Sequence, residues 1–303
     1  MNEDLLTDEA APYLFELPEC ITPEPKIRPL RHPIWTENKA KLIERYLYYF
    51  VLITKHGTYI DGFAGPQETD KPEMWAAKLV LESEPKRLRH LHFYDIGPDQ
   101  ITALRELRDS QPPRKPKEPK REVQVYPGDF NQTVHQLLGS NSIRQKEACF
   151  CLLDQRTFEC HWSTVEAIAQ YKKAGPKIEL FYFLMNHWSG RTFAAQKDTS
   201  VLLNWWGRSD WPELRQMRPL KRMEAFVDRF KNDLGYKSVK PWPIYQREDG
   251  GNVMYYMIHA TDHPAAPGLM YRAYHKAVLP KESEEQLSLE FHLPSQNAST
   301  QID

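Results

Sequence analysis

Hydrophobic and polar positions along the middle of this chain follow two different spacings. Short, mostly apolar runs recur, and between them lie stretches whose apolar residues stand three or four positions apart. The first spacing is typical of buried strands and the second of helices. The sequence therefore predicts strands at 58–61, 91–95, 123–126, 148–153 and 177–184, separated by helices at 36–50, 74–81, 99–107, 132–138 and 163–172.

The alternation of strand and helix predicts a parallel sheet with right-handed crossovers and helices on both faces. Near its end, runs at 242–247 and 252–258 flank Glu248-Asp249-Gly250-Gly251, a hairpin signal that predicts two antiparallel closing strands. A doubly wound α/β sheet that is mostly parallel and closes with such a hairpin is class I methyltransferase-like, a Rossmann-like fold. The Trp- and Arg-rich region at about 190–240 predicts a helical insert before the hairpin.

Composition divides the chain into three regions. Prolines recur from Pro18 to Pro33, so residues 1–33 are expected to form an extended N-terminal arm. Residues 34–280 hold the methyltransferase-like α/β domain, which ends with a helix at about 267–277. Residues 281–303 are polar and rich in Ser, Glu and Gln, which predicts a flexible tail.

Charge and hydropathy exclude several classes of protein. The 40 basic and 41 acidic residues give a net charge of -1, so the chain lacks the global basic field of a nucleic-acid coat protein. No apolar run approaches the roughly 20 residues that span a bilayer, and no membrane contact is expected. The N-terminus lacks a secretory pattern, and the four cysteines form no Cys-x-x-Cys pair. We expect free thiols, no metal site and a cytoplasmic location.

Acidic residues follow four of the predicted strands. Asp61, Asp95, Asp129 and Asp154 each come at or just after a strand, and the carboxyl ends of parallel strands meet at one edge of the sheet. Glycines in the turn after Asp61 allow the backbone to approach a ligand closely. This pattern suits S-adenosylmethionine, with Asp95 accepting from the ribose hydroxyls and Asp129 lying near the adenine amine. The predicted cofactor-binding residues are Asp61, Gly62, Phe63, Ala64, Gly65, Asp95 and Asp129.

Two other interpretations of these acids stay open. Any one of them could cap the helix that follows it, because Asp favours that position. Together they could instead bind a divalent metal ion for phosphodiester hydrolysis, which would make the protein a metal-dependent nuclease.

The substrate side of the site is expected after the fourth and fifth strands. Asp154 could accept from a substrate amine, and Phe158 could stack on a base. Arg156 could hold a phosphate or simply pair with Asp154 or Glu159. His187 is a candidate general base, with a structural role as the alternative. The predicted catalytic residues are Asp154, Arg156, Phe158 and His187. In the insert, Trp205, Trp206 and Trp211 lie among arginines, where they could clamp a nucleic acid or pack the insert on the sheet.

The block Tyr59 to Pro66, with the sequence Tyr-Ile-Asp-Gly-Phe-Ala-Gly-Pro, resembles the signature of the three-Cys-motif partner proteins. The resemblance covers about residues 36–277 and implies a methyltransferase-like Rossmann fold. It also implies pairing with a separate three-cysteine-motif protein that looks like a radical adenosylmethionine enzyme. Further matches are Lys41, Tyr46, Leu153-Asp154, His161-Trp162 and Asp262-His263-Pro264.

The sequence departs from the family pattern at two places. Gln67 stands where the family usually has Gly, and Asp154-Gln155-Arg156 replaces its usual Asp-Pro-aromatic-Gly. The predicted function is an S-adenosylmethionine-dependent methyltransferase that acts on nucleic acid or together with the three-cysteine protein. Because the altered block weakens the case for methyl transfer, a non-catalytic interaction partner with a degenerate methyltransferase fold is the alternative.

Overall fold

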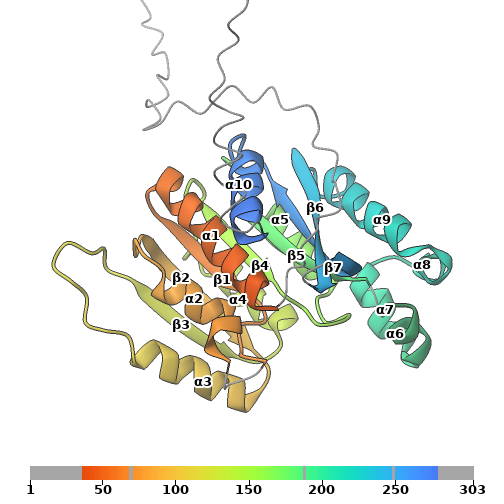
Figure 1. Cartoon of the computed structure of the whole chain (residues 1–303), viewed down its shortest axis with the longest axis horizontal. Helices are drawn as coiled ribbons and strands as arrows, with labels where there is room; N and C mark the ends of the chain where they lie inside the picture. The colour runs from red at the N-terminus through yellow and green to blue at the C-terminus, as the bar shows by residue number, and fades with distance from the viewer. Residues whose placement is uncertain (1–35, 68–70, 187–188, 248–249, 279–303) are drawn as a thin grey trace, which may run out of the picture.

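A computed structural model describes residues 36–67, 71–186, 189–247 and 250–278 (Figure 1). The arm expected at 1–33, the tail expected at 281–303 and His187 lie outside these ranges. Within them, one mixed sheet carries helices on both faces. No helix in these ranges is long and apolar enough to cross a membrane.

The sheet has seven strands in the order β3-β2-β1-β4-β5-β7-β6. The first five in sequence are parallel, and β7 runs antiparallel to both of its neighbours. This confirms the predicted fold class, including the closing hairpin. The strands are β1 Gly57–Asp61, β2 Leu88–Asp95, β3 Glu122–Pro127, β4 Cys149–Leu153, β5 Glu179–Met185, β6 Ser238–Arg247 and β7 Gly250–Thr261.

Alternation of side chains along the strands divides the apolar interior into two cores, one on each face of the sheet. In β4, Cys149, Cys151 and Leu153 belong to one core, whereas Phe150 and Leu152 belong to the other. The first core is covered by α4 Phe130–Gly139, α5 Trp162–Gln170, α7 Thr199–Trp206 and α9 Pro219–Asn232. The second is covered by α1 Thr36–Thr54, α2 Ala76–Glu82, α3 Pro98–Asp109 and α10 Ala266–Val278.

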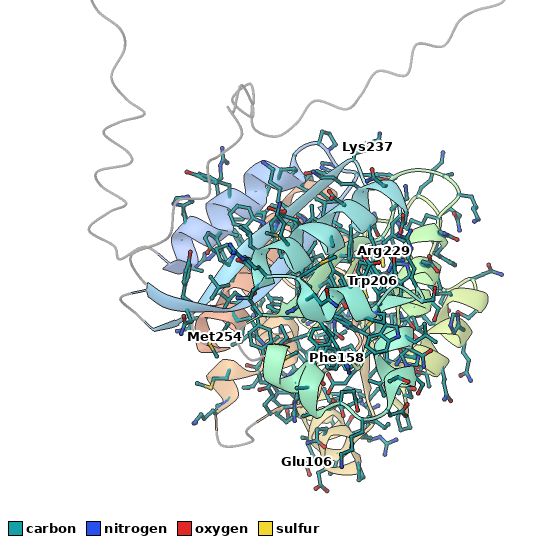
Figure 2. The ribbon with its side chains drawn as sticks, turned by 90° about the vertical axis from the view of Figure 1, so that its right-hand side faces the viewer. Glu106, Phe158, Trp206, Arg229, Lys237 and Met254 are labelled. Carbon is teal, nitrogen blue, oxygen red and sulfur yellow. The ribbon has the colours of Figure 1, made fainter. Side chains whose placement is uncertain are left out.

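Four helices lie between β5 and β6, where the sequence predicts an insert. They are α6 Ser189–Ala195, α7, α8 Pro212–Gln216 and α9. Trp205 and Trp206 are buried in the first core, and the Arg229 guanidinium lies 3.6 Å from the ring centre of Trp162 and 4.5 Å from that of Trp206 (Figure 2). These two tryptophans therefore pack the insert on the sheet and are not open to a nucleic acid. Of the two interpretations, the packing one is correct for this pair.

Candidate functional site

A cleft of about 600 Å³ opens at the carboxyl ends of the central strands, and we call it the strand-end cleft. It lies where the strand order reverses between β1 and β4, the usual ligand position in doubly wound sheets. Asp61, Asp95, Asp129 and Asp154 all line it, so the predicted convergence of the four acids is confirmed. Gly62, Phe63, Ala64 and Gly65 line it as well.

The turn after β1 is held tightly by its neighbours. The backbone N–H of Gly62 donates to Leu152 O at 3.0 Å, and that of Ala64 donates to Tyr94 O at 2.8 Å. Trp75 Nε1 donates to the Ala64 carbonyl at 2.6 Å. Bonds to β4, to β2 and to the residue before α2 thus fix the turn from three sides.

Close packing explains the glycines of this turn. A Cβ on Gly62 would lie 2.7 Å from the ring of Phe130. A Cβ on Gly65 would lie 2.3 Å from Gln100 Cβ and 2.5 Å from Asp95 Oδ2. Real Cβ atoms do not approach other atoms this closely, so both positions require glycine unless the neighbours move.

Asp95 joins this turn to the start of α3. Its Oδ2 accepts from Gly65 N and its Oδ1 accepts from Gly97 N, both at 2.9 Å. Each carboxylate oxygen has two lone pairs, so acceptor capacity remains for a pair of hydroxyls. The next residue, Ile96, is 76% exposed and also lines the cleft, which gives the site an apolar wall beside the acid.

Asp61 is buried at the base of the cleft. It accepts from Tyr59 Oη at 3.0 Å and from Phe63 N at 3.2 Å. Loss of hydration raises the pKa of Asp61 to about 7; the two hydrogen bonds oppose this rise, and the charges of Asp154 and Asp95 add to it. The charge of Asp61 therefore changes near neutral pH.

Asp129 does cap a helix. Its Oδ1 accepts from Asn131 N at 2.9 Å and from Asn131 Nδ2 at 2.8 Å at the start of α4. The capping interpretation therefore holds for this residue, although its side chain also faces the cleft. Capping does not hold for Asp154, because α5 begins after His161 without any side-chain cap.

Lys39 is the site residue that the sequence analysis missed. Its Nζ lies 2.6 Å from Asp154 Oδ2 and 2.9 Å from Oδ1, and the two side chains are only 8% and 14% exposed. The ammonium also lies 4.9 Å from the ring centre of Phe183. One signal was available: Lys39 occupies the same face of α1 as the buried Ile43 and Tyr46, four and seven positions later.

One alternative for Arg156 was an ion pair with Asp154 or Glu159. Lys39, and not Arg156, neutralises Asp154, while the backbone N–H of Arg156 donates to Glu159 Oε2 at 2.6 Å. Arg156 itself is exposed and lines the cleft. Its side chain is thus placed at the surface of the site.

Gln155 and Phe158 fix the segment after β4. Gln155 is buried, accepts from Cys160 N at 2.9 Å and donates to Phe183 O at 3.3 Å. Phe158 is buried as well, with its ring centre 4.9 Å from Phe193 and 4.8 Å from Trp205. Phe158 is among the residues that line the cleft, but its ring is only 3% exposed because Phe193 and Trp205 of the insert pack on it, so the expectation that it stacks on a substrate base gains no support.

Three of the four cysteines lie within the described ranges. Cys149, Cys151 and Cys160 are free and buried, as expected for three of the four thiols; Cys20 lies outside these ranges. Burial raises the pKa of Cys149 to about 12, which leaves it unreactive at neutral pH.

No group of three or more His, Cys, Asp or Glu side chains in the described residues is placed to hold a metal ion. The nuclease interpretation therefore gains no support from the geometry of the four acids.

The sequence matches no protein-family model and no curated protein. Solved structures with a similar backbone include the CurJ carbon methyltransferase, at 14% identity over 74% of this chain with a TM-score of 0.45. Another is the plantazolicin methyltransferase BamL, solved with SAH, at 8% identity over 86% of this chain with a TM-score of 0.40. A third is a SAM-dependent methyltransferase from Methanosarcina mazei, at 11% identity over 71% of this chain with a TM-score of 0.36. This chain spans 54% of the CurJ chain, 79% of BamL and 96% of the Methanosarcina protein. Likenesses this weak concern the fold alone, which the strand order by itself already establishes.

Proposed function

We propose that this protein binds S-adenosylmethionine in the strand-end cleft and transfers its methyl group to an acceptor held beside Asp154. The observation that carries the proposal is the meeting of a glycine turn and four strand-end carboxylates in one cleft. A volume of about 600 Å³ lies within the range of small-molecule and cofactor sites.

The residues present fit the cofactor. Gly62 and Gly65 bring backbone to the cleft surface without a Cβ, and Asp61 offers a carboxylate toward a cationic amino-acid end. Asp95 retains lone pairs for the ribose hydroxyls, and Ile96 offers an apolar surface to the adenine ring. Asp129 is already a helix cap, so only its remaining lone pairs would serve the adenine amine.

Asp154 is the residue we assign to the acceptor. When bound, the cofactor supplies an electrophilic methyl group. The carboxylate of Asp154 would accept a hydrogen bond from the acceptor N–H or O–H and receive its proton, while Lys39 fixes the orientation of that carboxylate. Arg156, exposed at the cleft edge, would hold an anionic part of the acceptor. We propose a nucleic acid as that acceptor, a cytoplasmic location and, on the motif resemblance, cooperation with a three-cysteine-motif protein.

A non-catalytic partner is the second candidate, favoured by the Lys39–Asp154 ion pair. The carboxylate of Asp154 already has Lys39 as an ion-pair partner at 2.6 Å, and Phe158 is only 3% exposed although it lines the cleft. This candidate retains cofactor binding but predicts no turnover.

Calorimetry with S-adenosylmethionine and S-adenosylhomocysteine tests cofactor binding. Asp95→Asn should weaken binding about tenfold or more, because it removes a charged acceptor for hydroxyl donors. Asp99→Asn is the matched control, since Asp99 is an exposed acid in the first turn of α3. Absence of binding to the folded wild-type protein at millimolar ligand would overturn the proposal.

Transfer of a labelled methyl group to nucleic acid tests the reaction. Asp154→Asn should abolish transfer and leave the cofactor affinity within about twofold, since Asp154 is assigned to the acceptor. Cofactor binding without transfer to any cellular nucleic acid or protein fraction would support the non-catalytic candidate instead.

A further inference from the structure

A second cavity lies at the other end of the sheet from the strand-end cleft. It measures about 270 Å³ and is lined by the first residues of β4 and β5, the second half of α1 and the start of α10. Phe50, Ile53 and Leu269 form apolar walls. None of its lining residues belongs to the cleft described above. We call it the α1–α10 cavity.

Basic side chains outnumber available acids around this cavity. Lys146, Lys172 and Lys177 line it, together with the acids Glu147 and Glu179. Glu179 is buried and already satisfied, because it accepts from Tyr46 Oη, from Thr261 Oγ1 at 3.0 Å and shares a 2.9 Å contact with His259 Nε2. Lys177 in turn is paired with Asp262, with 3.6 Å between the charged atoms.

Lys146 is exposed, which leaves Lys172 and Glu147 as the buried charged groups of this cavity without an ion pair between side chains among the described residues. Lys172 is only 8% exposed, and its Nζ donates to the backbone carbonyl of Glu147, not to the carboxylate. The other two ammonium hydrogens have no described acceptor among the residues that the structure covers. Burial lowers the pKa of Lys172, and the nearby Cys149 and Glu147 oppose this shift.

A further unsatisfied group lines the same cavity. His56 lines the cavity, and its Nδ1 is buried without a hydrogen-bond partner among the described residues. Buried polar atoms are normally paired, so the unpaired Nδ1 and the ammonium with unused hydrogens point to a polar ligand, and the ammonium calls for one that carries acceptors.

We propose that the α1–α10 cavity binds a small amphipathic monocarboxylate. Its carboxylate would meet Lys172, and its apolar body would lie against Phe50, Ile53 and Leu269. The volume admits a short chain or a single ring, and one buried cation suits one negative charge. This proposal does not depend on the function proposed for the strand-end cleft.

Hexanoate is the probe, with hexanamide and hexylamine as neutral and cationic analogues of the same length. Ligand-observed NMR on the full-length protein measures the three affinities. Hexanoate should bind most tightly, hexanamide about tenfold more weakly, and hexylamine should not bind measurably, because charge-assisted hydrogen bonds to the carboxylate would be lost.

Three variants place the binding at this cavity. Lys172→Met should weaken hexanoate binding about tenfold or more, whereas Lys173→Met, at the exposed neighbouring lysine, should leave it unchanged. Glu147→Gln should strengthen binding, since it removes a negative charge that acts on Lys172, and a gain in binding cannot result from a failure to fold.

Three outcomes would overturn the proposal. The first is that hexanoate at millimolar concentration does not bind the folded protein. The second is that hexylamine or hexanamide binds as tightly as hexanoate. The third is that Lys172→Met and Lys173→Met have the same affinity for hexanoate.

Discussion

Replacement of Asp61 by Asn should stabilise the protein at alkaline pH and change its stability little at acidic pH. Loss of hydration on burial raises the pKa of Asp61 to about 7 from an ordinary value of 3.8. In the pH range between these two values the folded protein holds a proton that the unfolded chain releases. The free energy of unfolding therefore falls as pH rises through this range, because the native state binds more protons than the unfolded state.

The size of the effect follows from the two pKa values. Each pKa unit corresponds to roughly 1.4 kcal/mol, so the rise from 3.8 to about 7 sets an upper bound of about 4 kcal/mol. The stabilising contribution of protonated Asp61 is complete below about pH 4 and is lost as pH rises through about 7. The variant amide carries no charge and can still accept from Phe63 N, so it avoids most of this loss.

Urea unfolding of the wild-type protein and of Asp61→Asn over a pH series from about 5 to about 8.5 measures the difference. Asp99→Asn, at an exposed acid, serves as the control for the general effect of removing one negative charge. The advantage of Asp61→Asn over the wild type should grow with pH and level off above about pH 7.5. A difference that is constant with pH, or that grows toward acid, would refute the assignment of a buried acid whose pKa is raised.

Three more predictions concern the site. Lys39→Met should lower the free energy of unfolding, measured in urea, by roughly 3 kcal/mol, because Asp154 is left nearly buried without its partner. The double variant Lys39→Met with Asp154→Leu should recover most of this loss, and no recovery would contradict the pairing. Gly65→Ala should weaken S-adenosylhomocysteine binding about tenfold or more by calorimetry, since the new Cβ would lie 2.5 Å from Asp95 Oδ2; unchanged affinity would mean the turn does not touch the ligand. Gln155→Ala should lower the melting temperature by several degrees, as two buried backbone groups lose their hydrogen-bond partner, and an unchanged melting temperature would contradict this.

Local patterns in the sequence determine much of this protein. The central strands β1, β4 and β5 are short, mostly apolar runs because both of their faces are covered, as the division of β4 between two cores shows. Asp61, Asp95 and Asp154 follow such runs, and parallel strands end at the same edge, so the position of each acid along the chain is enough to predict that they meet. The glycine turn next to them follows from the same reasoning.

The polar partners in the cleft were decided by tertiary structure. Lys39 and Asp154 are 115 positions apart, and their pairing depends on how α1 lies across the sheet beside the end of β4. Phe158 is buried because helices of the insert, from a later part of the chain, cover its ring. A periodic pattern specifies which face of an element is buried, but it does not specify which distant element covers that face. The sequence therefore predicts the cleft and its acids, whereas the Lys39–Asp154 ion pair and the burial of the Phe158 ring depend on contacts between segments far apart in the chain.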